Sequence, residues 1–173
     1  MDPPWPIEPM VLKKYKLSVP YPTMSLEEIE QLPICDISDD NCALFLWTTH
    51  SFLPDALHLA KKWNFKFYCL LTWDKVSGLT HQGIFRRTEF VIYAYKGKMN
   101  IKQTGKAIPA LFREAKGSHS TKPRIFDNWI RSNTQEPRLD MFARIKKLGF
   151  DSFGNDPKLD EKEITVSLEA FCN

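Results

Sequence analysis

The chain has 173 residues, of which 43% are hydrophobic, and its formal net charge of +3 permits a nucleic-acid partner without requiring one. The length predicts a single domain over residues 1–173. The four cysteines show no C-x-x-C spacing and no apolar run approaches the length of a bilayer span, so we expect a cytoplasmic protein without disulfides, structural metal or membrane partner.

The first elements along the chain are a loop, a short helix and a strand. Residues 7–23 are rich in proline, lysine and tyrosine and are expected to form a loop. The stretch SLEEIEQL at 25–32 predicts a helix, because Ser25 and Glu28 form a capping-box pair. The continuous apolar run CALFLWTT at 42–49 predicts a strand that is buried on both faces.

Helices and strands then alternate. Residues 52–65 predict a helix capped by Ser51, with Pro54 in its first turn, and residues 121–133 predict another, with Pro123 near its first position. Strands are expected in FKFYCLLTWDK, RRTEFVIYAYKGK, ALFREA, RLDMFAR and FDSFGND, at 65–75, 86–98, 110–115, 138–144 and 150–156.

This alternation predicts an α/β fold with a mostly parallel sheet and helices on both faces. Ligands of such sheets bind at the carboxyl ends of the strands. The rule gathers five polar stretches at one edge of the sheet: DPPW, TTHS, TWDK, AKGSHS and FARIKK, which begin at residues 2, 48, 72, 115 and 142.

The DPPW stretch carries groups that suit the exocyclic amine of a nucleobase. Such an amine is a poor nucleophile, because its lone pair is delocalised into the ring. The Asp2 carboxylate and the Pro3 carbonyl can accept its two hydrogens, and Pro4 restricts Pro3 to extended angles. The face of Trp5, or of a neighbouring tyrosine, can stack on a base that is single-stranded or flipped out. A proline-rich terminal arm is the alternative interpretation of these residues taken alone.

Six stretches in order closely resemble the family of S-adenosylmethionine-dependent adenine N6-methyltransferases that includes the eukaryotic messenger-RNA adenosine methyltransferase. They are DPPW, YPTMSLEEIEQLPI, ALFLWTT, WNFKFYCLLTWDK, HSTKP and LDMFARIKKLGFDSFGND. The resemblance implies a Rossmann-like class I methyltransferase fold with a permuted motif order, S-adenosylmethionine as cofactor, and methylation of the N6 amine of adenine in nucleic acid. It also implies that members often work as homodimers or heterodimers.

The same resemblance implies roles for individual residues. The catalytic motif would be Asp2, Pro3, Pro4 and Trp5. In the cofactor pocket, Lys122 would meet the carboxylate of the cofactor, and Arg144 and Asn155 would hydrogen-bond its ribose. Asp140, Phe142 and Asp156 would also belong to the pocket. Taken without the family, Lys122 and Arg144 can equally be solvated surface charges, and Asn155 a turn residue that tolerates left-handed angles.

In the family a buried strand precedes DPPW, whereas only Met1 stands before Asp2 here. We therefore expect the first strand to be missing, and three explanations stay open: the sequence starts too late, a partner chain supplies the strand, or the protein is a degenerate relative that folds without it. We expect the chain to dimerise or pair at the exposed edge. The alternative to an active enzyme is a non-catalytic subunit that binds nucleic acid or supports an active partner. A weaker third interpretation is a methyltransferase acting on small-molecule or protein amines.

The sequence gives two expectations about the nucleic-acid substrate. DNA is slightly favoured over RNA, because the compact chain resembles a microbial or viral member. Phosphate contacts are expected from a rim of basic residues, with an ordinary solvated face as the alternative. The rim comprises Lys13, Lys14, Lys16, Arg86, Arg87, Lys96, Lys98, Lys102, Lys106, Arg144, Lys146 and Lys147.

Overall fold

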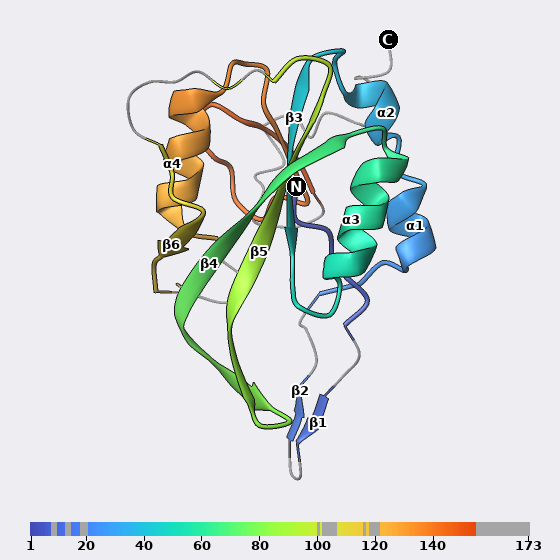
Figure 1. The fold of residues 1–173 in the computed structure, drawn as a ribbon. Coiled ribbons are helices and arrows are strands. Elements are labelled where there is room, and N and C mark those ends of the chain that lie inside the picture. Colours follow the sequence, from blue (N-terminus) through green and yellow to red (C-terminus); the bar gives the residue numbers. More distant parts are fainter. Residues whose placement is uncertain are drawn as a thin grey trace.

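The computed structural model describes residues 1–7, 10–12, 15–17, 21–99, 101, 107–115, 117 and 122–154. It confirms a mixed α/β architecture (Figure 1). Within the described ranges, no helix has the length and apolar character needed to span a bilayer. The elements are β1 Met10–Leu12, β2 Tyr15–Leu17, α1 Leu26–Glu30, α2 Ile34–Ile37, β3 Cys42–Thr48, α3 Leu53–Lys62, β4 Lys66–His81, β5 Ile84–Lys96, β6 Leu111–Arg113, α4 Arg124–Asn133, β7 Leu139–Met141 and β8 Asp151–Phe153.

The main sheet has the strand order β3-β5-β4-β6. β5 is antiparallel to both of its neighbours, while β6 is parallel to β4. β3, β4 and β6 therefore run in one direction and β5 runs against them. The sheet is mixed rather than mostly parallel, because β4 and β5 are joined by a tight turn, which can connect only antiparallel strands. β7 and β8 form a separate parallel pair.

Helices cover both faces of the main sheet. Alternate β3 residues point to opposite sides, so Leu44 and Leu46 pack on the side of α1 and α3, while Trp47 packs on the side of α4. Figure 1 shows α1 and α3 on one side of the strands and α4 on the other. This two-sided burial explains why the β3 sequence is a continuous apolar run.

The β4–β5 hairpin extends beyond the rest of the sheet, toward the β1–β2 hairpin (Figure 1). Its register breaks between Asp74, which pairs with Thr88, and Leu79, which pairs with Arg86. The Asp74 carboxylate stabilises the break, because it accepts hydrogen bonds from the Val76 backbone N–H at 2.9 Å and from Arg87 at 2.8 Å. We call the part of the hairpin beyond this break, residues 79–86, the β4–β5 arm.

Most local sequence signals were accurate, but several bounds were wrong: β4 runs to His81 rather than ending at Lys75, β7 is shorter than the predicted strand 138–144, and α4 begins at Arg124 with Pro123 as its N-cap. The capping box between Ser25 and Glu28 is present at α1. The predicted cap Ser51 is wrong, because Phe52 is the N-cap residue of α3 and provides no side-chain hydrogen bond. The expected loop 7–23 contains β1 and β2, and α2 was not predicted.

Candidate active site

The DPPW stretch begins at the edge of β3 and lies beside β7. The Met1 amino group donates to the Phe45 carbonyl at 3.1 Å, and the Met1 carbonyl accepts from the Trp47 N–H at 3.0 Å. On the other side, the Asp2 N–H donates to the Met141 carbonyl at 3.4 Å. These backbone bonds fix the direction in which the Asp2 side chain leaves the sheet.

Lys122 is the centre of the candidate site. It precedes Pro123, the N-cap residue of α4, and its ammonium lies 3.1 Å from Oδ2 of Asp2 and 3.0 Å from Oε2 of Glu89 on β5. The other Glu89 oxygen lies 3.0 Å from the ammonium of Lys75. The result is a chain of alternating charges, in the order Asp2, Lys122, Glu89, Lys75.

Burial and these ion pairs act in opposite directions on the charged groups. Burial alone would lower the pKa of Lys122, but the carboxylates of Asp2 and Glu89 raise it above the ordinary lysine value. Burial alone would raise the pKa of Glu89, but the ammonium groups of Lys122 and Lys75 hold it below the ordinary glutamate value. At neutral pH Lys122 is therefore a fixed cation and Glu89 a fixed anion.

The two prolines of the motif present their carbonyl groups to neighbouring backbone. The Pro3 carbonyl accepts the Trp5 N–H at 2.9 Å, and the Pro4 carbonyl accepts the Met24 N–H at 2.9 Å. A carbonyl oxygen has two lone pairs, so Pro3 retains capacity for a second donor such as a base amine. The bond to Met24 attaches the motif to the segment that leads into α1.

Trp5 is a packing residue in this structure. Its side chain is only 3% exposed, its indole N–H donates to the Trp47 carbonyl at 3.1 Å, and its ring stacks on Phe52 at 5.3 Å. The indole face is thus covered by protein. The neighbouring tyrosine considered in the sequence analysis has a counterpart in Tyr21, which is only partly buried.

Apart from Lys122, the described residues that were predicted for the cofactor pocket lie on β7 or directly after it. Asp140 on β7 is paired with Lys147 at 3.0 Å, and Lys147 in turn pairs with Asp127 at 3.0 Å. Phe142 and Arg144 follow β7, and the Arg144 guanidinium stacks on the Tyr21 ring at 4.2 Å. Asn155 and Asp156 lie outside the described residues.

Phe142 adopts a left-handed backbone conformation with φ of 63°, directly after β7. The turn is held by the Ala143 N–H, which donates to the Phe153 carbonyl at 3.0 Å. Gly154 is needed at this point, because a Cβ there would lie 2.3 Å from the Ala143 carbonyl oxygen. The strained turn projects Phe142 and Arg144 beyond the carboxyl end of β7.

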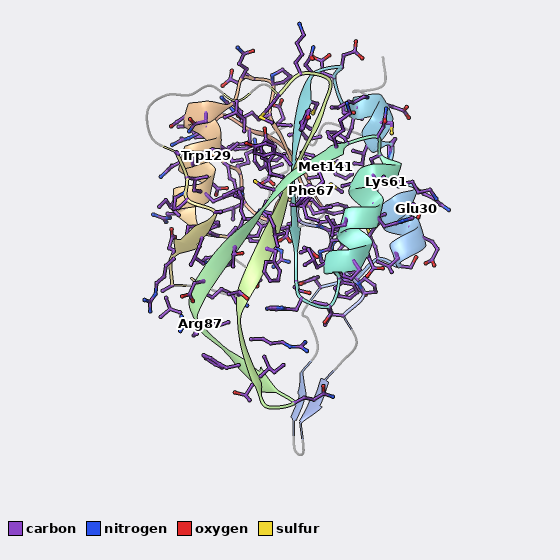
Figure 2. All side chains as sticks on the ribbon, in the orientation of Figure 1. Glu30, Lys61, Phe67, Arg87, Trp129 and Met141 are labelled. Carbon is purple, nitrogen blue, oxygen red and sulfur yellow. The ribbon has the colours of Figure 1, made fainter. Side chains whose placement is uncertain are left out.

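Several residues of the predicted basic rim are engaged by protein groups. Arg87 pairs with Asp74 at 2.8 Å, and the Lys96 ammonium donates to Ser38 Oγ at 3.2 Å. Figure 2 shows Arg87 on the β4–β5 hairpin, on the opposite side of the view from Lys61 on α3. Four further members lie outside the described residues: Lys13, Lys14, Lys102 and Lys106.

Glu89 and Lys75 were not predicted as site residues. Glu89 stands within the strand TEFVIYAY, where it is a single carboxylate in an otherwise apolar and aromatic run. A lone charge at such a position is itself a signal, because a half-buried strand carboxylate needs a cation partner. Its partner could not be identified from spacing, because Lys122 is distant in the sequence.

Comparison with known proteins gives two findings. A family model described as MT-A70 matches residues 1–156. The type II methyltransferase M.MunI from Mycoplasma sp is 30% identical over 154 residues, which are 88% of this chain and 66% of that relative. The chain thus spans just under two-thirds of the length of the curated relative.

Proposed function

The chain belongs to the MT-A70 family, and from this premise we propose that it transfers a methyl group from S-adenosylmethionine to the N6 amine of adenine in nucleic acid. The observation that supports the proposal most is the ion pair between Lys122 and Asp2. It joins the residue expected to meet the cofactor to the residue expected to hold the amine.

The donor set fits the amino-acid end of S-adenosylmethionine. The ammonium of Lys122 has three N–H groups, and two of them are directed at Asp2 and Glu89, so one is left for a carboxylate. Arg144 would lie at the ribose side and Phe142 at the wall of the pocket. When bound, S-adenosylmethionine supplies a methyl group on a positively charged sulfur.

The protein's part in the reaction is positioning and charge stabilisation. Asp2 accepts one hydrogen of the amine, and the free lone pair of the Pro3 carbonyl accepts the other, which fixes the direction of the nitrogen lone pair. The nitrogen would become positively charged as its bond to the methyl carbon forms and the carbon–sulfur bond of the donor breaks, and the Asp2 carboxylate would stabilise that charge. One proton would then leave the nitrogen for solvent water, which gives the neutral methylated amine. Glu89 neutralises Lys122, so that the lysine does not cancel the effect of Asp2.

The base requires an aromatic surface that is not already covered. Because the Trp5 ring is buried and stacks on Phe52, we assign Trp5 to fixing the motif. We assign base stacking to the face of Tyr21 opposite the one that the Arg144 guanidinium covers. The adenine must be unstacked to reach this site, so single-stranded or flipped-out substrate is expected. We take DNA as the favoured substrate and RNA as the comparison.

Methyl transfer to single-stranded DNA and RNA oligonucleotides, measured by mass spectrometry, tests the proposal. Asp2→Asn keeps the shape of the side chain and is expected to lower the rate about 100- to 1,000-fold. The exposed Asp36→Asn is the matched control, with an unchanged rate. Wild-type protein that binds oligonucleotide and S-adenosylmethionine but transfers no methyl group would instead support the non-catalytic subunit.

A further inference from the structure

The first turn of α4 is capped by a side chain that lies ten positions before Arg124 in the sequence. Pro123, the N-cap residue, makes no side-chain hydrogen bond to the helix. The Glu114 carboxylate takes this role: Oε1 accepts the Arg124 N–H at 2.9 Å, and Oε2 accepts the Ile125 N–H at 3.1 Å. The amino end of a helix carries a partial positive charge, so hydrogen bonding and charge both favour a carboxylate there.

The backbone of Glu114 is fixed to the main sheet. Glu114 directly follows β6, and its N–H donates to the Asp74 carbonyl of β4 at 3.2 Å. Its carbonyl accepts the indole N–H of Trp73, also on β4, at 2.8 Å, and the Trp73 side chain is buried. Glu114 therefore joins the carboxyl ends of β4 and β6 to the amino end of α4.

A second series of contacts leads from Trp73 to Lys122. The Trp73 and Trp47 rings pack edge to face, with their centroids 5.9 Å apart. The Lys122 ammonium lies 4.7 Å from the centre of the Trp47 ring, and the Lys122 backbone directly precedes Pro123. Glu114 is thus connected to both ends of Lys122, through the two indole rings to the ammonium and through the first turn of α4 to the backbone.

The Glu114 carboxylate acts on the first turn of α4 alone. Within the part of the chain that the structure describes, it forms no ion pair, and backbone N–H groups occupy both of its oxygens. The body of α4 is held separately, because Phe126 and Ile130 pack in the core cluster with β-strand residues. Loss of the carboxylate would therefore loosen the turn beside Lys122 without releasing the helix from the sheet.

We propose that Glu114 is a positioning residue for Lys122. By fixing the first turn of α4, Glu114 holds the Lys122 backbone at the place from which its ammonium reaches Asp2. The inference rests on the proposed function in one respect, because it takes Lys122 as the partner of the cofactor carboxylate. Glu114 acts on the reaction only through this lysine.

The first experiment follows the position of Lys122 without cofactor. Glu114→Ala removes a CH₂–COO⁻ group, which acetate matches in size and charge. The side-chain signal of Lys122 is observed by NMR in protein with labelled lysine and is assigned from Lys122→Met. In Glu114→Ala we expect this signal to move toward that of the exposed Lys61. Acetate should restore it, whereas neutral acetamide should not, because the helix end favours an anion.

The second experiment measures S-adenosylmethionine affinity by titration calorimetry. Glu114→Ala should weaken binding about tenfold, as expected when one residue positions another. The same substitution in a Lys122→Met background should weaken binding little further, because the lysine that Glu114 positions is then absent. Glu27→Ala is the matched control, since Glu27 is an exposed carboxylate in the first turn of α1. It should change neither the affinity nor the Lys122 signal.

An unmoved Lys122 signal in Glu114→Ala would overturn the proposal, and so would an equal loss of affinity with and without Lys122. Equal recovery with acetamide would also overturn it, because volume rather than charge would then be missing. If Glu114→Ala does not fold, Glu114→Gln, which keeps the shape and one acceptor oxygen, enters the same comparisons. If the wild-type protein binds no S-adenosylmethionine, the proposed function fails, while the Lys122 signal still decides the role of Glu114.

Discussion

The ammonium of Lys122 lies 3.1 Å from the Asp2 carboxylate, so the start of α4 and the DPPW motif form one electrostatic unit. The same ammonium lies 4.7 Å from the centre of the Trp47 ring. A cation held between carboxylates and an aromatic face has little freedom to move. Lys122 therefore fixes the relative position of two segments that are distant in the sequence.

Replacement of this cation is expected to weaken cofactor binding. Lys122→Met keeps much of the side-chain length but removes the charge-assisted hydrogen bonds, each worth about 1.5–3 kcal/mol. S-adenosylmethionine affinity, measured by titration calorimetry, should fall about 10- to 150-fold. Lys61→Met, at an exposed position of α3, is the control. Unchanged affinity in Lys122→Met would remove this residue from the cofactor site.

Glu89 should make the stability of the protein sensitive to acid. Its pKa is lowered in the folded state, so its ionised form stabilises the fold above its ordinary value of 4.5, and that contribution is lost as the pH falls through the lowered pKa. Glu89→Gln should cost about 1.5–3 kcal/mol at pH 7. Urea unfolding from pH 7 to pH 3 should show this difference shrinking toward zero. A difference that stays constant with pH would show that Glu89 acts by shape alone.

The indole N–H of Trp5 is expected to matter more than its ring. Trp5→Phe keeps an aromatic ring beside Phe52 but leaves the buried Trp47 carbonyl without this donor, at a cost of about 1–3 kcal/mol. Trp129→Phe is a close control, because the Trp129 indole N–H is buried and has no hydrogen-bond partner among the described residues. Thermal unfolding should separate the two variants. Equal losses would mean that ring volume dominates at both positions.

The helix caps offer a comparison between two serines. Ser25→Ala removes the side-chain half of the capping box of α1 and should cost about 1 kcal/mol. Ser51→Ala should be nearly neutral, since Ser51 is not the N-cap residue of α3. Chemical denaturation of both variants is sufficient. A larger loss in Ser51→Ala would contradict the helix start at Leu53.

The accuracy of the sequence predictions depended on how local the determining interactions are. The α1 cap needs only residues three positions apart, and the β3 strand needs only its own apolar run, so both were predictable. The antiparallel direction of β5 follows from the tight turn at Gln82 and Gly83, a local signal that the sequence analysis missed. The position of β5 between β3 and β4 was not predictable, because strand order is set by long-range pairing. The covered face of Trp5 depends on Phe52 and Trp47, which no spacing rule connects to DPPW.

The site followed the same pattern. Asp2 and Lys122 were named on chemistry and resemblance, and the structure brings them into contact. Glu89 pairs with Lys122 from within β5. The alternation of residues along a strand indicates which side chains are buried, but it does not indicate which of them belong to a functional site. A half-buried charge is recognisable in a sequence, but its partner depends on the tertiary fold.

The register break in the β4–β5 hairpin separates the molecule into two parts that can be varied independently. Glu89 lies on the sheet side of the break, Lys75 directly follows Asp74 at the start of it, and the arm at residues 79–86 lies beyond it. The arm can therefore be shortened or exchanged at the Leu79–Arg86 pair without removing a member of the charged chain. Changes confined to residues 79–86 should therefore leave the ion pairs among Asp2, Lys122, Glu89 and Lys75 in place.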